Sequence, residues 1–509
     1  IEKAQKDDKK LLIVAQNLIE GRNNFHQNAK IGMKYLKKAL KCDDNEEAFV
    51  YYCELLIKGK IIPKNLQKAQ KLIKKQTKEY PVLLGKIMKK EKKYEKAKEL
   101  FEKAIKEGNG EAMYEYGKLL IKGQYEEEGI QYYLNSIEKN FPKAMYKYGL
   151  YLLSNRDESK SLEYIKMAAN KGCVKAMYQY SLILENRENH SSLDDQEIEF
   201  YLRNAANFGH AESMFKYSLI LAKKQDNDSK KLIEHYLKKA SDKGHICAMY
   251  YYGLLLYEKD DSPSVLRDAA HYIKISADNG NMEEKAQYGI MLIHGKGISI
   301  NYEEAAKYLK ESTNHQNNPD AFFGLGYLYE NGKGVEKDDK KAYQYYKLSA
   351  KYKSTDALLR LGNDYFDGQI DGVNIPLAKY CFSSCIKLIN NDFVNAAKAI
   401  ENSYRSFNNL GLIDICAYED PDNAKLHFGQ ASLNGYPFAQ NNYGVVLQFY
   451  FNEIEEAKKM FIEASRINYS LFEYNIAYLY EREGDYKKAL EFYILTSEHE
   501  KEPLIFRRQ

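Results

Sequence analysis

Apolar and small residues recur at helical spacing through almost the whole chain, and the clearest copy of the pattern runs from Pro319 to Lys351. In its first half, Ala321 and Leu325 fall on one helical face. Gly332 and Gly334 then interrupt the pattern, because two glycines so close together favour a turn. A second apolar stripe follows the turn. One helical hairpin cannot bury both stripes, so the pattern predicts stacking on neighbours of the same kind.

The position of Gly326, which we call the small slot, recurs in register along the chain. From residue 53 to residue 362 the steps between slots are 32 to 37 residues, a period typical of helix–turn–helix solenoids. The slots are Ala15, Cys53, Gly85, Gly117, Gly149, Ser181, Ser218, Gly253, Gly289, Gly326 and Gly362, followed after an irregular stretch by Gly444 and Ala477.

Each slot has a characteristic neighbourhood. A Tyr or Leu usually stands one residue before it, a Leu or Tyr three residues after it, and in most copies an Ala five residues before it. The second predicted helix closes on two small residues, such as Ser349 and Ala350, and a Gly often follows them. Alternation of large and small residues along one face is what close helix–helix approach requires.

The series Ala-x-x-x-Leu-Gly-x-x-Tyr, then Gly-x-Gly-Val-x-x-Asp-x-x-Lys-Ala-x-x-Tyr, resembles the Sel1-like repeat, a relative of the tetratricopeptide repeat. Residues 321–350 match it best and residues 286–313 match well, whereas the copies between 112 and 281 lack the Gly-x-Gly turn. The copies at 439–465 and 471–496 are closer to plain tetratricopeptide units. Pattern and resemblance together predict an all-α, right-handed α-solenoid, or superhelix, of about 13–14 antiparallel helix pairs.

The period fails between Asn390 and Asp422, where we expect one degenerate pair with residues 415–425 as its loop. We interpret this stretch as an insertion on the outer face, with a hinge between two arms as the alternative. The predicted organisation is therefore an N-terminal and central Sel1-like solenoid over 1–390, a degenerate repeat or hinge over 391–422, and tetratricopeptide-like repeats over 423–509.

No catalytic constellation stands out. The chain contains no HExxH, Walker-type or GxSxG motif, and the glycine pairs recur inside the repeat, so they are interpreted as turns. His210 and His245 occupy matching places after a helix-ending Gly, where we expect them to satisfy helix-end carbonyls. Cys381 and Cys385 lie one helical turn apart without a His nearby, which favours buried small hydrophobes over metal ligands. We therefore predict no catalytic residues, no cofactor and no metal.

Charge is unevenly distributed, although the net charge is only +4. Residues 1–110 carry 27 Lys and Arg against 15 Asp and Glu. We interpret this excess of positive charge as belonging to helix faces that are exposed to solvent. The alternative is that this end of the chain binds an acidic partner or nucleic acid. Our prediction is that the protein does not bind nucleic acid. No run of residues is long and apolar enough for a membrane span.

One series goes beyond helix packing. Aromatic residues stand three positions before the small slot, on the second face of the first helix of each pair, which lines the concave surface in tetratricopeptide-like solenoids. Aromatic stripes at helical spacing commonly pack between successive first helices; our hypothesis for a partner-binding site is that this aromatic ladder instead binds a peptide from a partner. The ladder consists of Tyr114, Tyr146, Tyr178, Phe215, Tyr250 and Phe323, is interrupted at Ala286, and resumes at Tyr474.

These features predict a non-catalytic scaffold or adaptor for protein partners, and the resemblance agrees, since Sel1-like proteins typically serve as assembly platforms in signalling and protein quality control. One alternative is the luminal adaptor of a ubiquitin ligase in endoplasmic-reticulum-associated degradation. Another is the repeat tail of a larger protein, such as a protist protein kinase. We expect a cytoplasmic protein, or a protein of the endoplasmic reticulum lumen if an upstream signal peptide has been removed. The sequence does not define the oligomeric state.

Overall fold

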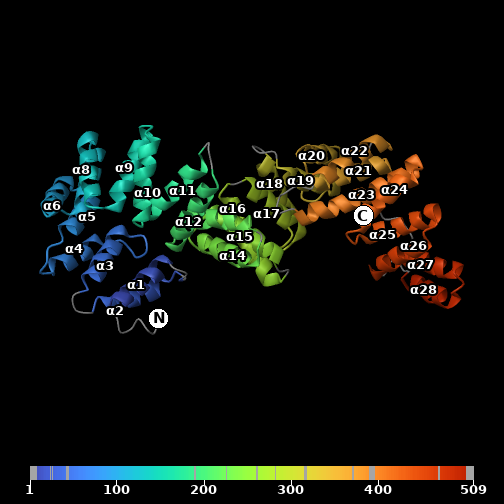
Figure 1. Ribbon diagram of the computed structural model, residues 1–509, viewed down its shortest axis with the longest axis horizontal. Coiled ribbons are helices and arrows are strands. Elements are labelled where there is room, and N and C mark those ends of the chain that lie inside the picture. Colours follow the sequence, from blue (N-terminus) through green and yellow to red (C-terminus); the bar gives the residue numbers. More distant parts are fainter. Residues whose placement is uncertain are drawn as a thin grey trace. The chain divides into compact units, whose positions relative to one another are not determined.

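The computed structural model describes residues 8–22, 25, 27–41, 45–187, 191–224, 226–259, 262–280, 282–313, 318–369, 372–388, 396–467 and 470–499. These residues form 28 α-helices and no strand (Figure 1). The chain divides into two compact units, Ile1–Tyr252 (unit 1) and Gly253–Gln509 (unit 2), with the boundary inside α15. Within each unit consecutive helices pack against one another, so both units have the predicted solenoid fold.

The helices pair in chain order, α1 with α2 through α27 with α28, which agrees with the predicted number of pairs. The first helices are α1 (Asp8–Glu20), α3 (Glu46–Lys58), α5 (Pro81–Lys90), α7 (Gly110–Lys122), α9 (Pro142–Ser154), α11 (Val174–Glu185), α13 (Ala211–Ala222), α15 (Ile246–Lys259), α17 (Met282–His294), α19 (Pro319–Asn331), α21 (Thr355–Asp367), α23 (Ala396–Tyr418), α25 (Pro437–Val446) and α27 (Ser470–Arg482). The second helices are α2 (Ala29–Ala39), α4 (Leu66–Lys74), α6 (Tyr94–Lys106), α8 (Glu126–Glu138), α10 (Glu158–Asn170), α12 (Ser192–Asn207), α14 (Asn227–Asp242), α16 (Pro263–Asp278), α18 (Tyr302–Thr313), α20 (Asp339–Lys351), α22 (Ile375–Lys387), α24 (Pro421–Ser432), α26 (Ile454–Ala464) and α28 (Tyr486–His499).

The small slot is the contact point between the two helices of a pair. A Cβ atom placed on Gly362 of α21 would lie 2.5 Å from the ring of Phe382 on α22. On Gly149 of α9 it would lie 2.6 Å from Ile165 of α10. Both partner side chains are completely buried. The residue at the small slot has little or no side chain, because a large side chain of the second helix already occupies that space.

The stretch after Asn390 differs from the expectation. Residues 396–418 form one 23-residue helix, α23, and its Gly411 is a small slot whose Cβ would lie 2.7 Å from Phe428 of α24. The expected helix pair is present as α23 and α24, and the turn lies inside the predicted loop at 415–425 but consists of Glu419 and Asp420 alone. Residues 389–395 lie outside the described part of the chain, and the domain division near them stays a prediction.

The two glycines of a Gly-x-Gly turn are required for different structural reasons. Gly332 ends α19 in the left-handed conformation, with φ +61°, where glycine carries no steric penalty. Gly334 passes so close to the start of α18 that a Cβ would lie 2.4 Å from the backbone of Tyr302. The turn glycines therefore let one pair approach the second helix of the pair before it.

The small residues that close the second helices also have a definite role. Ser349 donates a hydrogen bond of 2.7 Å to the carbonyl of Pro319, at the start of α19 in the same pair. Ser312 and Ser136 make the same bond to Met282 and Gly110. Cys385 takes the serine's place on α22, and burial raises the pKa of its thiol to about 11, which fits the predicted structural role.

Replacing Gly411 by Ala should lower the free energy of unfolding by about 1–3 kcal/mol, because the added methyl collides with Phe428. Gly429 on the partner helix is the matched control: its Cβ would find nothing closer than 3.7 Å. Gly429→Ala should therefore raise stability by about 0.5–1 kcal/mol through helix propensity. Urea denaturation followed by circular dichroism measures both, and equal effects of the two substitutions would contradict the packing role of the slot.

Candidate functional site

The aromatic ladder lies on the first helices α7, α9, α11, α13, α15 and α19, as its register requires. Tyr114 and Tyr250 are buried, each 6% exposed, while the other four members are half-buried. Several rings contact the residue that precedes the next first helix. Ring centroids are 5.4 Å apart for Tyr114 and Phe141, and 4.9 Å apart for Tyr178 and His210. The rings thus contribute to the stacking of successive pairs, and partner binding by their exposed edges stays a prediction.

The two histidines act at the start of helices, and the expected contact with helix-end carbonyls is wrong. The Nδ1 atom of His210 accepts a hydrogen bond of 3.3 Å from the backbone N–H of Ser213, and His245 accepts one of 3.1 Å from Ala248. Both are N-cap contacts. Burial lowers the pKa of His210, which favours the neutral ring that can accept this bond.

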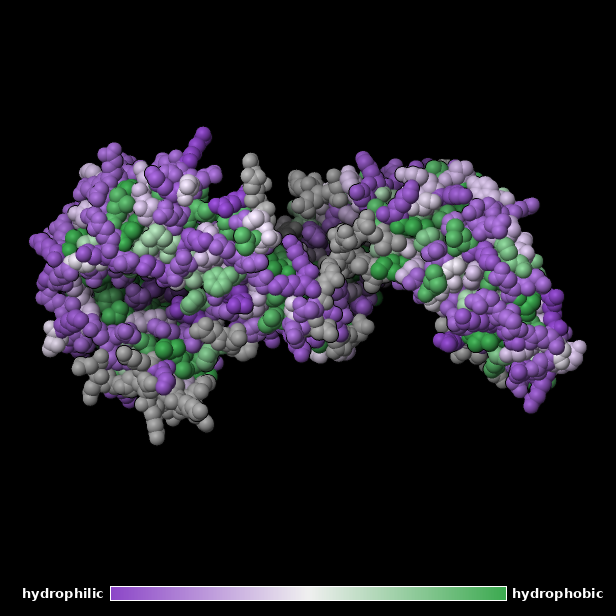
Figure 2. Space-filling view, viewed as in Figure 1, coloured by the Kyte–Doolittle hydropathy of each residue, from purple (hydrophilic) through white to green (hydrophobic). Residues whose placement is uncertain are grey.

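A hollow of about 570 Å³ in unit 1 brings two ladder residues, Tyr114 and Tyr146, together with lysines. The lining comes from α7, α9, the start of α11 and the segment after α1. In Figure 2 the visible face of unit 1 is hollowed, with α1 and α2 on one side and α9 to α11 on the other. The remaining ladder members do not line this hollow; Phe323 lines another one, in unit 2.

The N-terminal segment closes one side of this hollow, which the repeat pattern did not predict. The Lys243 Nζ donates a hydrogen bond of 2.9 Å to the backbone carbonyl of Glu20, across 223 residues of sequence. The guanidinium of Arg22 lies 5.8 Å from the centroid of the Phe208 ring and lines the hollow. The residues that directly follow α12 and α14 therefore meet the end of α1 and the segment after it, within unit 1.

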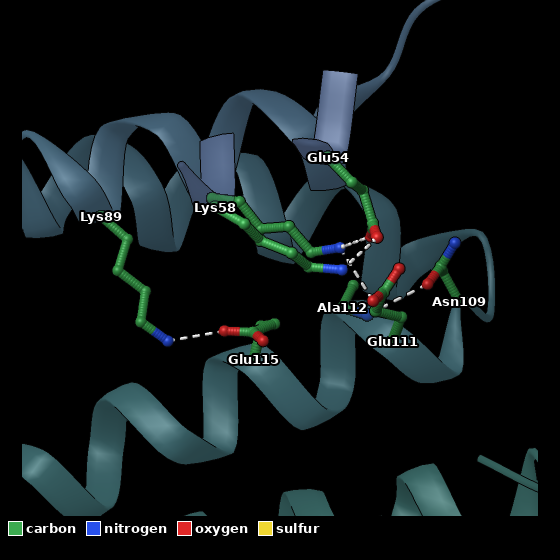
Figure 3. Close-up of polar contacts among 8 residues, drawn as sticks. Glu54, Lys58, Lys89, Asn109, Glu111, Ala112 and Glu115 are labelled. Carbon is green, nitrogen blue, oxygen red and sulfur yellow. Dashed lines mark hydrogen bonds and ion pairs between the residues drawn. The ribbon is translucent and has the colours of Figure 1, made fainter. Parts of the chain in front are cut away.

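A second hollow, of about 430 Å³, adjoins the first and shares Lys118 and Lys143 with it. Here the three lining glutamates of α3 and α7 pair with lysines of α3 and α5, as Figure 3 shows, and the lining holds eight lysines in all. The Lys86 Nζ lies 2.9 Å from a Glu54 oxygen and 2.8 Å from a Glu111 oxygen. Burial alone would raise the pKa of Glu54, but the nearby Lys86 and Lys58 hold it at about 2.

In unit 2 a chain of asparagines follows the same face of the first helices, and the sequence interpretation missed it. The Asn409 side chain donates to Asn363 (2.8 Å). Asn442 donates to Asn408 (2.9 Å), and Asn475 of α27 donates to Asn441 (2.7 Å). Weaker bonds of 3.3 Å and 3.5 Å within α23 and α25 complete the chain. The available signal was Asn at the ladder position, three residues before Gly411 and Gly444.

The scan of family models matches the Sel1 repeat nine times, at residues 46–75, 83–109, 110–141, 142–173, 248–281, 286–317, 319–351, 355–384 and 470–499. These matches cover more than half of the chain, which therefore belongs to the Sel1 repeat family.

The solved structure of c5321 supports the fold. The chain is similar to c5321, described as a protective antigen of uropathogenic Escherichia coli with an SLR fold: 20% identity, TM-score 0.54, over 79% of this chain and 89% of that one. It is also similar to a Sel1 repeat protein from Oxalobacter formigenes, with 19% identity and a TM-score of 0.41, over 61% of this chain and 88% of that one. The search of curated proteins found no match.

None of the described residues form a group of three or more His, Cys, Asp or Glu side chains suited to a metal ion. None of the described helices has both the length and the apolar character that a membrane span needs.

The Glu54–Lys86 ion pair predicts that the free energy of unfolding depends on pH in the acidic range. Because the folded-state pKa of Glu54 is lower than that of an unfolded glutamate, about 4.3, its contribution is present above that pH and is lost as the pH falls toward 2. Glu54→Gln should lower stability at neutral pH by about 1–3 kcal/mol and make stability less sensitive to acid.

Urea denaturation at neutral pH and at about pH 3 measures this loss, because at pH 3 the Glu54 carboxyl is protonated in the unfolded chain and still largely ionised in the folded protein. Glu46, which pairs with Lys78 at an exposed site, provides the control. Glu46→Gln should behave like the wild type. Parallel pH profiles for Glu54→Gln and wild type would contradict the ion-pair account.

Proposed function

We propose that the protein is a non-catalytic scaffold or adaptor that binds partner proteins or peptide segments along the face formed by its first helices. A Sel1 or tetratricopeptide-like fold is typical of protein-interaction scaffolds, which gives the class of function. The observation that supports the proposal most directly is the hollow of unit 1. There the half-buried ring of Tyr146 stands beside lysines on a surface open to solvent. Aromatic side chains with accessible edges are common anchors in protein interfaces.

The geometry favours an extended segment as the bound element. The two adjoining hollows follow successive first helices, α5, α7, α9 and α11, and share part of their lining. A chain that follows the groove meets one repeat after another, and each contributes a small part of the contact. An interface of this kind obtains its affinity from a few anchors rather than from one deep pocket.

Affinity capture with quantitative mass spectrometry tests the proposal. The variant carries Tyr146→Ala, Tyr178→Ala and Phe215→Ala, which removes half-buried ladder rings and spares the buried Tyr114 and Tyr250. Loss of anchors at this face should reduce partner affinity by at least about 2 kcal/mol, or roughly thirtyfold, so the specific partners should disappear from the captured set.

The control variant, Tyr125→Ala with Phe200→Ala, removes rings that are 61% and 53% exposed on second-helix segments. It should leave the captured set unchanged. Tyr178 and Phe215 also contact His210 and His245, so Tyr146→Ala alone is included as a variant that removes no such contact. A captured set that is unchanged in both Tyr146→Ala and the folded triple variant would refute the proposal.

A further inference from the structure

All the charged side chains that line the hollow containing Tyr114 and Tyr146 are positive. Six of the thirteen described residues that line it are cationic, and no carboxylate is among them. We call these six, together with the rings between them, the cationic groove. The cationic side chains are those of Arg22, Lys118, Lys143, Lys147, Lys171 and Lys175.

The lysines of the groove lack the acidic partners found next to it. In the adjoining hollow, Lys86 and Lys89 pair with glutamates at 2.6–2.9 Å. Within the described part of the chain, no carboxylate forms an ion pair with Lys143, Lys147 or Lys175. Burial lowers the pKa of Lys147, and the neighbouring Lys118 and Lys175 lower it further. The fold thus holds these three lysines together without ion-pair partners among the described residues, whereas Arg22 pairs with Glu20.

Aromatic and apolar surface lies between these charges. The Lys118, Lys143 and Lys147 ammonium groups are 5.7–5.9 Å from the ring centroids of Tyr114, Phe141 and Tyr146. Pro142 and Val174 complete this part of the lining. A ligand that suits the groove therefore carries several negative charges next to an apolar or aromatic side chain.

We propose that the cationic groove binds an acidic segment of a partner protein, with Asp or Glu side chains against the lysines and an aromatic side chain against Tyr146. The inference rests on the proposed function and specifies the partner's chemistry. A protein segment is the occupant typical of the Sel1 repeat fold. A nucleic acid is the alternative polyanion, because the adjoining hollow is lined by eight lysines against three glutamates, and polyuridine in the test below distinguishes the two. A peptide can place its acidic residues only where the lysines are.

Fluorescence anisotropy with the full chain tests this inference. The probe is a short fluorescein-labelled peptide of alternating Glu and Phe, compared with its Gln-for-Glu counterpart and with a labelled polyuridine oligonucleotide. The variant is Lys143→Gln, Lys147→Gln, Lys175→Gln, and the matched control is Lys230→Gln, Lys231→Gln, Lys238→Gln on α14, three exposed lysines outside the groove.

The wild type should bind the Glu peptide more tightly than the Gln peptide, and added salt should weaken the binding. Loss of three lysines should weaken it by about tenfold, and the control variant should bind like the wild type. Any of three results would overturn the inference. These are absent or equal binding of the two peptides, full affinity in the groove variant, or tighter binding of polyuridine that the groove variant loses.

The two proposals fail separately. If the wild type does not bind the Glu peptide but Tyr146→Ala still loses the partners that the wild type captures, the proposed scaffold role is supported and the acidic-segment inference is refuted. If the Glu peptide binds through the lysines while the captured set never depends on the ladder, the inference about the groove stands and the role of the ladder falls.

Discussion

The contact between a small residue on one helix and a large one on its partner holds each repeat together. At Gly362 and Gly411 the partner is a buried phenylalanine, and at Gly149 it is an isoleucine. Removing the side chain at the slot lets the helices approach closely enough for the ring to exclude water from between them. The pair still leaves one apolar face uncovered, which only the next pair can bury. Stacking is thus a consequence of this contact and not an independent feature of the fold.

The sequence was sufficient to predict the fold, because the slot, its large neighbours and the closing small residues recur often enough to be recognised without coordinates. The slot at Gly411 was not predicted, because it lies 49 residues after Gly362, outside the 32 to 37 residues that separate the earlier slots. A different signal was present: Phe382 follows its slot by 20 residues and Phe428 follows Gly411 by 17. The slot and its partner ring are a local pair, whereas the period also depends on the length of each turn.

The candidate site was less predictable because it depends on which repeats lie near one another. The ladder register correctly located Tyr114 and Tyr146 on the first helices, but the cationic groove joins residues of three helices with Arg22, which follows α1. Lys243 and Glu20 meet across 223 residues, a contact that no local pattern encodes. The face formed by the first helices carries paired charges around Glu54 and lysines without ion-pair partners around Lys147. In unit 2 the same type of face carries hydrogen-bonded asparagine side chains. One fold therefore provides several chemistries along one type of surface, as expected of a scaffold.

A single pair should not fold alone, because one of its apolar faces needs a neighbour. The most direct measurement is circular dichroism of the isolated segment 319–351, the best-formed pair, compared with the full chain during thermal unfolding. The account predicts that the segment is mostly unstructured and melts without a cooperative transition, since isolated helices of 13 residues are marginal in water. A helical segment that unfolds cooperatively would contradict it.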